Sequence, residues 1–265
     1  MTAAVVFDIE AIPDLDAARR LLGLGDQISD EDVRSRLGKR YAKDGDDPAT
    51  AFLKVPVYKI VSLAALYSRR EENGSWITSQ MGSRHTGQKP EAEIVASFSK
   101  NLPLDDRGAG PLLVSFNGGS FDLPLLRFRA FTYGIPMPGL HGGNRRDYWY
   151  RFGKDHIDLC DLFASFGALT KPSLAELAAL AGIPAKPGGM DGSQVEEYVA
   201  AGRMDDVADY CLTDVVVTYC VFLRYALVRG ELSPEDFEAS MASLREHLER
   251  QVSQKPLLGD ILAAL

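Results

Sequence analysis

The sequence is short of the features that define several protein classes. Its 265 residues include only three cysteines, and none of them forms a Cys-x-x-Cys pair, which argues against a zinc knuckle or a disulfide framework. No uninterrupted apolar run approaches the roughly 18 residues needed to span a bilayer. The first residues also lack the basic segment and cleavage site of a secretory signal. We therefore expect a cytoplasmic protein without a membrane segment.

The composition excludes further classes. Hydrophobic residues make up 46% and charged residues 25% of the chain, which rules out wholesale disorder, collagen and a coiled coil. We find no internal repeat. The net charge of −8 argues against a basic coat that grips nucleic acid nonspecifically. It does not exclude a nucleic-acid enzyme, because a carboxylate-rich metal site is itself acidic and attracts phosphate only when it is loaded.

Positive charge gathers in one part of the chain. Between Leu123 and His156 the basic residues exceed the acidic ones by four, and this surplus is a candidate region for phosphate contacts. A solvated helix face followed by a loop accounts equally well for any single one of these residues. The basic residues are Arg127, Arg129, Arg145, Arg146, Arg151 and Lys154, against Asp147 and Asp155.

The first part of the chain alternates apolar strands with helical patterns, which predicts an α/β domain. An Asn-Gly hairpin at residues 72–74 joins two expected strands and indicates that the sheet is mixed. Residues 14–56 look like an insertion that contains two short helices, 14–22 and 29–43. The expected strands are 3–10, 57–68, 75–82, 111–116 and 156–162, and the expected helices after the insertion are 91–102 and 120–133.

The second part of the chain reads as helical. Ser173 with Glu176, and Ser193 with Glu196, fit the capping box, in which a hydroxyl and a carboxylate satisfy free amides at a helix start. A long helix is expected over 204–229, and a last one begins at Ser233-Pro234. We therefore expect a domain over residues 1–230 and a helical C-terminal extension over 231–265.

Carboxylates stand at the ends of two expected strands. Asp8 and Glu10 follow an apolar strand and point to the same face, because side chains alternate along a strand. Two adjacent carboxylates are costly unless a cation or protons offset their repulsion. Asp122 opens a helix just after the Asn117-Gly-Gly turn, where the helix dipole favours an anion. The simpler readings are a strand end in water for the first pair and an ordinary helix start for Asp122.

A third acidic group lies inside the long helix. Tyr210 and Asp214 are four residues apart and share one face, and their neighbours are largely apolar. The alternative is a polar stripe that continues Asp205, Asp206 and Asp209.

The order of these three motifs resembles the DEDD superfamily of 3′–5′ exonucleases, in its tyrosine (DEDDy) branch. The chain looks like the exonuclease family similar to the proofreading domain of family B DNA polymerases. The segments at 186–195 and 209–219 are similar to that family's C-terminal half, and the resemblance covers most of residues 1–230. It implies a ribonuclease H-like mixed sheet flanked by helices. The insertion at 14–56 has no counterpart in the minimal fold.

The resemblance assigns a role to each motif residue. Asp8, Glu10, Asp122 and Asp214 would bind metal, and Tyr210 would orient the attacking water. The residues that would border the 3′-terminal nucleotide are Ile12, Asn117 and Phe121.

Oxygen ligands of this kind favour Mg²⁺ or Mn²⁺ over zinc. Two such ions activate water on one side of a phosphodiester and stabilise the leaving 3′ oxygen on the other. We expect release of nucleoside 5′-monophosphates from single-stranded 3′ ends, with DNA ahead of RNA as substrate. Proofreading would need a separate polymerase or repair partner, because no polymerase domain fits into 265 residues.

Two alternatives compete with this interpretation. The first is a catalytically inactive ribonuclease H-like module that binds nucleic acid or docks a partner. The second is an aspartyl phosphatase site that begins at Asp8-Ile9-Glu10 and uses Asp205 and Asp206 as its acidic pair. That reading leaves the Asn117–Asp122 turn and the Tyr210–Asp214 helix unexplained.

Overall fold

The computed structural model describes residues 2–184 and 189–265, and in them one five-stranded sheet with the order β3-β2-β1-β4-β5. The antiparallel pairs are β1–β2 and β2–β3, whereas β4 lies parallel to both β1 and β5. The mixed sheet expected from the sequence is therefore confirmed. The strands are β1 (Ala3–Pro13), β2 (Tyr58–Arg70), β3 (Trp76–His85), β4 (Leu112–Ser115) and β5 (His156–Asp158).

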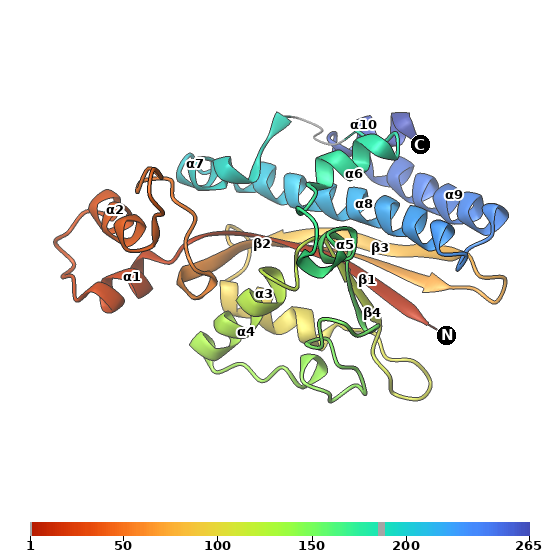
Figure 1. Cartoon of the computed structure of the whole chain (residues 1–265), viewed down its shortest axis with the longest axis horizontal. Coiled ribbons are helices and arrows are strands. Elements are labelled where there is room, and N and C mark those ends of the chain that lie inside the picture. Colours follow the sequence, from red (N-terminus) through yellow and green to blue (C-terminus); the bar gives the residue numbers. More distant parts are fainter. Residues whose placement is uncertain (1, 185–188) are drawn as a thin grey trace.

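Helices cover both faces of this sheet (Figure 1). On one face lie α3 (Glu91–Lys100) and α4 (Asp122–Tyr133), and on the other lie α8 (Met204–Val228) and α9 (Pro234–Gln251). β1 alternates between the two cores: Ala4 and Val6 pack on the α8 side, and Val5 and Phe7 pack on the opposite side. A strand buried on both faces reads as a continuous apolar run, which is why this strand was evident from the sequence.

The C-terminal helices share the core of the sheet. Phe237, Leu244 and Leu248 of α9 belong to the same apolar cluster as α8. Ser240 Oγ accepts a hydrogen bond from the backbone amide of Trp76 in β3 at 2.8 Å. A short helix, α10 (Leu258–Ala264), ends the chain and was not expected from the sequence.

Helix α8 is the central element of its layer. Its 25 residues agree with the expected helix over 204–229. Among the described residues, it is the one helix long and apolar enough to cross a membrane by length and composition. Most of its side chains are buried against the sheet and α9, and the core helix of a globular protein meets the same criteria.

The segment between β1 and β2 forms an arm, which we define as residues 14–57. It contains α1 (Leu15–Leu22) and α2 (Asp30–Tyr41) and projects from one end of the sheet (Figure 1). Its two ends lie side by side, because the Asp14 amide donates to the Val57 carbonyl at 2.8 Å. The arm is also tied to α7 (Val195–Ala200), where Arg34 Nε contacts Glu196 Oε2 at 3.0 Å.

Two local expectations differ from the structure. The strand expected over 156–162 ends at Asp158, whose side chain caps a short helix, α5 (Leu159–Phe163). The capping box Ser173–Glu176 is confirmed at the start of α6 (Leu174–Leu180). The box expected for Ser193 and Glu196 is wrong, because Asp191 and Gln194 form it around a 3₁₀ turn two residues earlier. Glu196 is engaged by Arg34 instead.

Three of the six basic residues between Leu123 and His156 form ion pairs with carboxylates of the protein itself. Arg129 is only 3% exposed and pairs with Asp14 and Glu91, both at 2.7 Å, so the expectation that it contacts phosphate is wrong. Arg146 pairs with Asp155, and Arg151 pairs with Asp161. Carboxylates of the protein itself therefore neutralise half of the basic side chains that were candidates for phosphate contacts.

Candidate active site

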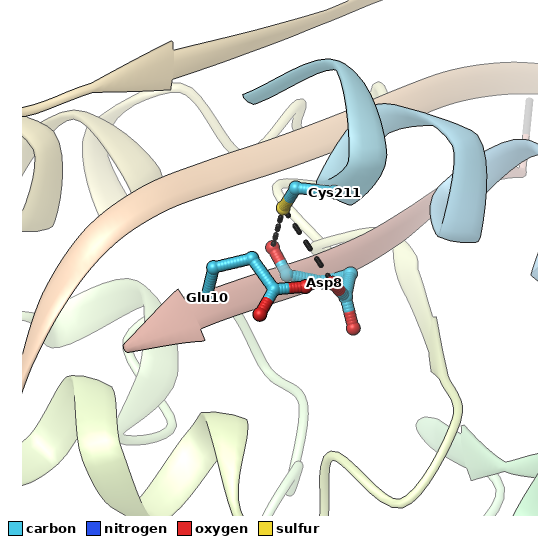
Figure 2. A group of neighbouring side chains, drawn as sticks. All are labelled: Asp8, Glu10 and Cys211. Carbon is cyan, nitrogen blue, oxygen red and sulfur yellow. Dashed lines mark hydrogen bonds between the residues drawn. The ribbon is translucent and has the colours of Figure 1, made fainter. Parts of the chain in front are cut away.

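Strand β1 presents Asp8 and Glu10 toward α8. Both side chains are half-buried, so the pair is not a strand end in water. A register shift after Glu10 marks an irregularity in the pairing with β2, and such bulges re-aim side chains beside sites. Cys211 of α8 lies over this pair, with its Sγ 3.4 Å from the Asp8 carbonyl oxygen and 3.5 Å from Asp8 Oδ2 (Figure 2).

Asp122 enters from the turn between β4 and α4. It is 4% exposed, and its Oδ1 has no hydrogen-bond partner among the described residues. The turn is tight: a Cβ at Gly118 would lie 2.4 Å from Ser115 Oγ and 3.1 Å from Asp122 Oδ2. Only glycine therefore lets the backbone approach this carboxylate so closely.

The same turn is fixed from β5. The Asp158 carboxylate accepts hydrogen bonds from the amides of Asn117 at 2.8 Å and Gly119 at 2.9 Å. Asn117 has a positive φ of 64°, which asparagine tolerates better than most residues, and its side-chain oxygen accepts from Lys171 Nζ at 2.7 Å. Asp158 and Lys171 thus hold the turn that delivers Asp122.

Helix α8 brings Tyr210 and Asp214 to the same place. The Tyr210 hydroxyl is hydrogen-bonded to Asp214, and the pKa of Tyr210 lies well above its usual value because of burial and then the negative charges of Asp214, Glu10 and Asp8. The alternative of a polar stripe along α8 is not what the structure shows, because the other three acids of this helix pair with residues outside this group. Asp205 pairs with His85, Asp206 with Arg203 and Asp209 with Lys255.

The raised pKa values of the acids show that they act on one another. The pKa of Asp8 is raised to about 6 by burial. The pKa of Glu10 is raised well above its usual range by burial first, and then by the charges of Asp8, Asp214, Asp122 and Asp191. Burial and the charge of Asp8 raise the pKa of Asp122 in the same way. Carboxylates far apart in the sequence therefore meet in one small volume.

The structure adds two residues that the site prediction did not include. Asp191 is one of the charges that raise the pKa of Glu10. Cys211 offers a sulfur that lies within 4.8 Å of ligand oxygens of Asp8 and Glu10. The sequence feature that could have identified Cys211 is its place one residue after Tyr210. Asp191 lies in the family-like segment at 186–195, of which residues 186–188 lie outside the described residues.

The three residues expected to contact the substrate lie in different elements near these acids. Ile12 packs at the edge of a small apolar cluster that includes Tyr210 and Val195. Phe121 directly precedes Asp122, and its ring packs against Tyr58 with centroids 5.6 Å apart. Asn117 lies in the turn before Asp122, on the side of Lys171.

The donor set fits divalent cations. Several half-buried or buried carboxylates repel one another here, and within the described part of the chain a buried carboxylate oxygen of Asp122 has no hydrogen-bond partner. Such an arrangement is costly in the absence of a positive charge. Hard oxygen ligands favour Mg²⁺ or Mn²⁺, whereas the sulfur of Cys211 is the one soft atom of the group.

The metal-free protein should lose stability as the pH rises from about 4 to above 6. The folded state holds a proton on Asp8 up to a pKa of about 6, against an ordinary value of 3.8. Between these values the folded state binds more protons than the unfolded state, so the free energy of unfolding falls with rising pH, by about 3 kcal/mol for a shift of this size. Glu10 and Asp122 act in the same direction.

Melting temperatures in EDTA and in Mn²⁺ at pH 5 and pH 8 measure this effect. Mn²⁺ should raise the melting temperature more at pH 8, where the carboxylates are charged and bind the cation. The Asp8→Asn variant is the control, since it should lose part of the pH dependence. A melting temperature in EDTA that rises from pH 5 to pH 8 would contradict the prediction.

Comparison with known proteins adds to this geometry. Residues 50–264 match the model of a family described as predicted 3′–5′ exonuclease related to the exonuclease domain of PolB. β1, which carries Asp8 and Glu10, precedes the matched range, whereas Asp122 and Asp214 lie within it.

Two archaeal polymerases are similar to parts of the chain. A DNA polymerase of Archaeoglobus fulgidus is 26% identical over 154 residues, which are 57% of this chain and 18% of the polymerase. The family B DNA polymerase from Pyrobaculum calidifontis has a similar structure, with a TM-score of 0.51 and 17% identity over 96% of this chain and 29% of that chain. This likeness shows the fold, and the expected ribonuclease H-like architecture is confirmed. The chain spans less than a third of either polymerase.

Proposed function

Because the chain belongs to the family of predicted 3′–5′ exonucleases related to the exonuclease domain of PolB, we propose that it removes nucleotides one at a time from the 3′ ends of single-stranded nucleic acid in a metal-dependent reaction. One observation carries this proposal. Carboxylates from β1, from the start of α4 and from the middle of α8 converge on one volume, where each raises the pKa of another. Such a cluster suits the binding of divalent cations and of the phosphate that they attract.

The four acids come from three elements of the fold. Asp8 and Glu10 come from the sheet, Asp214 comes from α8, and Asp122 comes from the glycine turn. We assign all four as ligands of Mg²⁺ or Mn²⁺. Two such ions supply activation of a water molecule and stabilisation of the leaving 3′ oxygen.

Tyr210 positions water rather than deprotonating it. Its pKa lies above the usual value near 10, so the hydroxyl keeps its proton at neutral pH. A protonated phenol beside Asp214 can hold the attacking water by hydrogen bonding. Burial of this tyrosine against Val195 and Met190 keeps its ring in place.

The substrate side of the proposal uses the residues that border the acids. Phe121 and Ile12 offer apolar surface to the terminal nucleotide, and Asn117 lies beside Lys171, whose positive charge suits a phosphate. An unpaired end suits such a site, because only an unstacked base presents its full face to an aromatic side chain. We propose DNA ahead of RNA as substrate and nucleoside 5′-monophosphates as products.

Degradation of matched DNA and RNA single strands tests the function. Strands labelled at the 5′ end should shorten in single-nucleotide steps with Mg²⁺ or Mn²⁺ and stay intact in EDTA. Strands labelled at the 3′ end should lose their label in the first step, which defines the polarity. The proposal is wrong if neither nucleic acid is shortened under any metal condition, or if the 5′ label is released first.

A further inference from the structure

Phe52 is a large aromatic residue that the fold leaves in water. Its side chain is 72% exposed, although both of its neighbours in the chain, Ala51 and Leu53, are buried. The backbone on each side is fixed: Arg34 Nη2 donates to the Ala51 carbonyl at 3.1 Å, and the Leu53 amide donates to Tyr58 Oη at 3.0 Å. The ring is thus held outward by an anchored backbone rather than carried on a loose loop.

The Phe52 ring lies near the elements that carry the proposed metal ligands. Its centroid lies 6.0 Å from that of Phe121 and 5.7 Å from that of Tyr58. Phe121 directly precedes Asp122 in the chain. Tyr58 pairs with Pro13 of β1, three residues beyond Glu10. Three residues of a strand span about 10 Å. The arm therefore places an exposed ring within a few nucleotides' reach of the proposed cleavage site.

The chemistry of such a surface points to unpaired bases. An exposed aromatic ring gains free energy when another flat apolar surface covers it. Bases stack on aromatic side chains without regard to sequence, because every base has a π-face. Lys54, exposed two residues after Phe52, adds positive charge to this part of the arm, where its Nζ lies over the Tyr41 ring. A single strand offers both the bases and the phosphates that match these groups.

We propose that Phe52, whose ring adjoins that of Phe121, forms a stacking surface for an unpaired base just upstream of the terminal nucleotide that Phe121 borders. This inference rests on the proposed function and extends it, because it gives the arm a part in holding the strand. Tyr58 lies beneath the two rings and supports both. Arg34 acts as a positioning residue, since it joins the backbone at Ala51 to Glu196 of α7.

Steady-state degradation of a 5′-labelled DNA single strand tests the inference. The Phe52→Ala variant should raise KM about tenfold with little change in kcat, which is the size expected for losing one stacked base. Phe52→Trp should keep the wild-type KM, because its ring also stacks. The matched control is Phe131→Ala: Phe131 is 87% exposed on α4, about 13 Å along the helix from Asp122, and its removal should change nothing.

Abasic substrates show whether a base lies on the ring. A single abasic nucleotide is placed at each of the first four positions from the 3′ end. Upstream of the terminal nucleotide, which Phe121 borders, one position should raise the wild-type KM, and the same change there should have no further effect on Phe52→Ala, since two losses of one contact are not additive.

The outcomes separate the two proposals. Equal KM values for Phe52→Ala and Phe131→Ala, or abasic effects that add to the Phe52→Ala effect, would overturn the inference while leaving the exonuclease proposal intact. A wild-type protein that degrades no single strand would overturn both. Melting temperatures of all variants should match the wild type, because both phenylalanine side chains are exposed.

Discussion

Asp8→Asn and Asp214→Asn are each expected to lower kcat on single-stranded DNA by at least about a thousandfold. Each variant removes a proposed metal ligand, and a metal site of this kind supplies several kcal/mol to the transition state; about 4 kcal/mol corresponds to a thousandfold in rate. The fold should remain intact, because asparagine keeps the size of the side chain and removes one charge from a set of mutually repelling carboxylates. Gel-based rates and melting temperatures measure the two effects.

The matched control is Asp206→Asn. Asp206 lies on the same helix as Asp214, but its side chain is half exposed and pairs with Arg203 at 2.9 Å. Its rate should stay within about twofold of the wild type, since exposed ion pairs contribute little. If Asp8→Asn were as active as Asp206→Asn, the assignment of the site would be wrong.

Arg129→Ala is expected to lower the free energy of unfolding by about 3–5 kcal/mol, because it leaves Asp14 and Glu91 buried without their cation. Arg129 contacts both carboxylates at 2.7 Å, and Tyr133 Oη donates to the same Glu91 at 2.7 Å. Glu91 Oε1 also accepts from the Ile60 amide, so the group links α3, α4 and β2. Urea unfolding followed by circular dichroism gives the change.

Arg127→Ala serves as the control for the loss of an arginine from the same helix. The Arg127 guanidinium lies over the Trp149 ring, 4.4 Å from its centroid, and the residue is exposed. Removing such a contact costs about 0.5–1 kcal/mol. Equal unfolding midpoints for the two variants would show that the buried group around Arg129 contributes no more than a surface contact.

Much of the fold follows from local pattern. β1 was evident because both of its faces are buried, and α8 was evident because its apolar residues recur with helical periodicity up to Gly230. The pairing of Asp8 with Glu10 follows from strand alternation, and the placement of Asp122 follows from the glycine turn. Each of these features is determined by residues that are close together in the sequence.

The features that the sequence did not reveal depend on distant partners. Arg129 looked like a surface cation, because nothing near it in sequence shows that Asp14 lies 115 residues away and in contact. The capping group at Asp191 and Gln194 competed with an equally good pattern two residues later, and the partner of Glu196 in the structure, Arg34, lies 162 residues away in sequence. The approach of Phe52 to Phe121 likewise requires the arm to fold back on the sheet.

The arm leaves β1 and returns to β2 through hydrogen-bonded neighbours, Asp14 and Val57. A segment attached in this way can change length at small entropic cost, since doubling a loop costs only about 0.6 kcal/mol. β1, which carries Asp8 and Glu10, pairs with β2 from Ala3 to Pro13, so its register does not depend on the length of the loops within the arm. A change of length in the exposed loops of the arm that keeps Asp14 and Arg34 in place would thus alter which nucleic-acid substrates bind and leave bond cleavage itself unchanged.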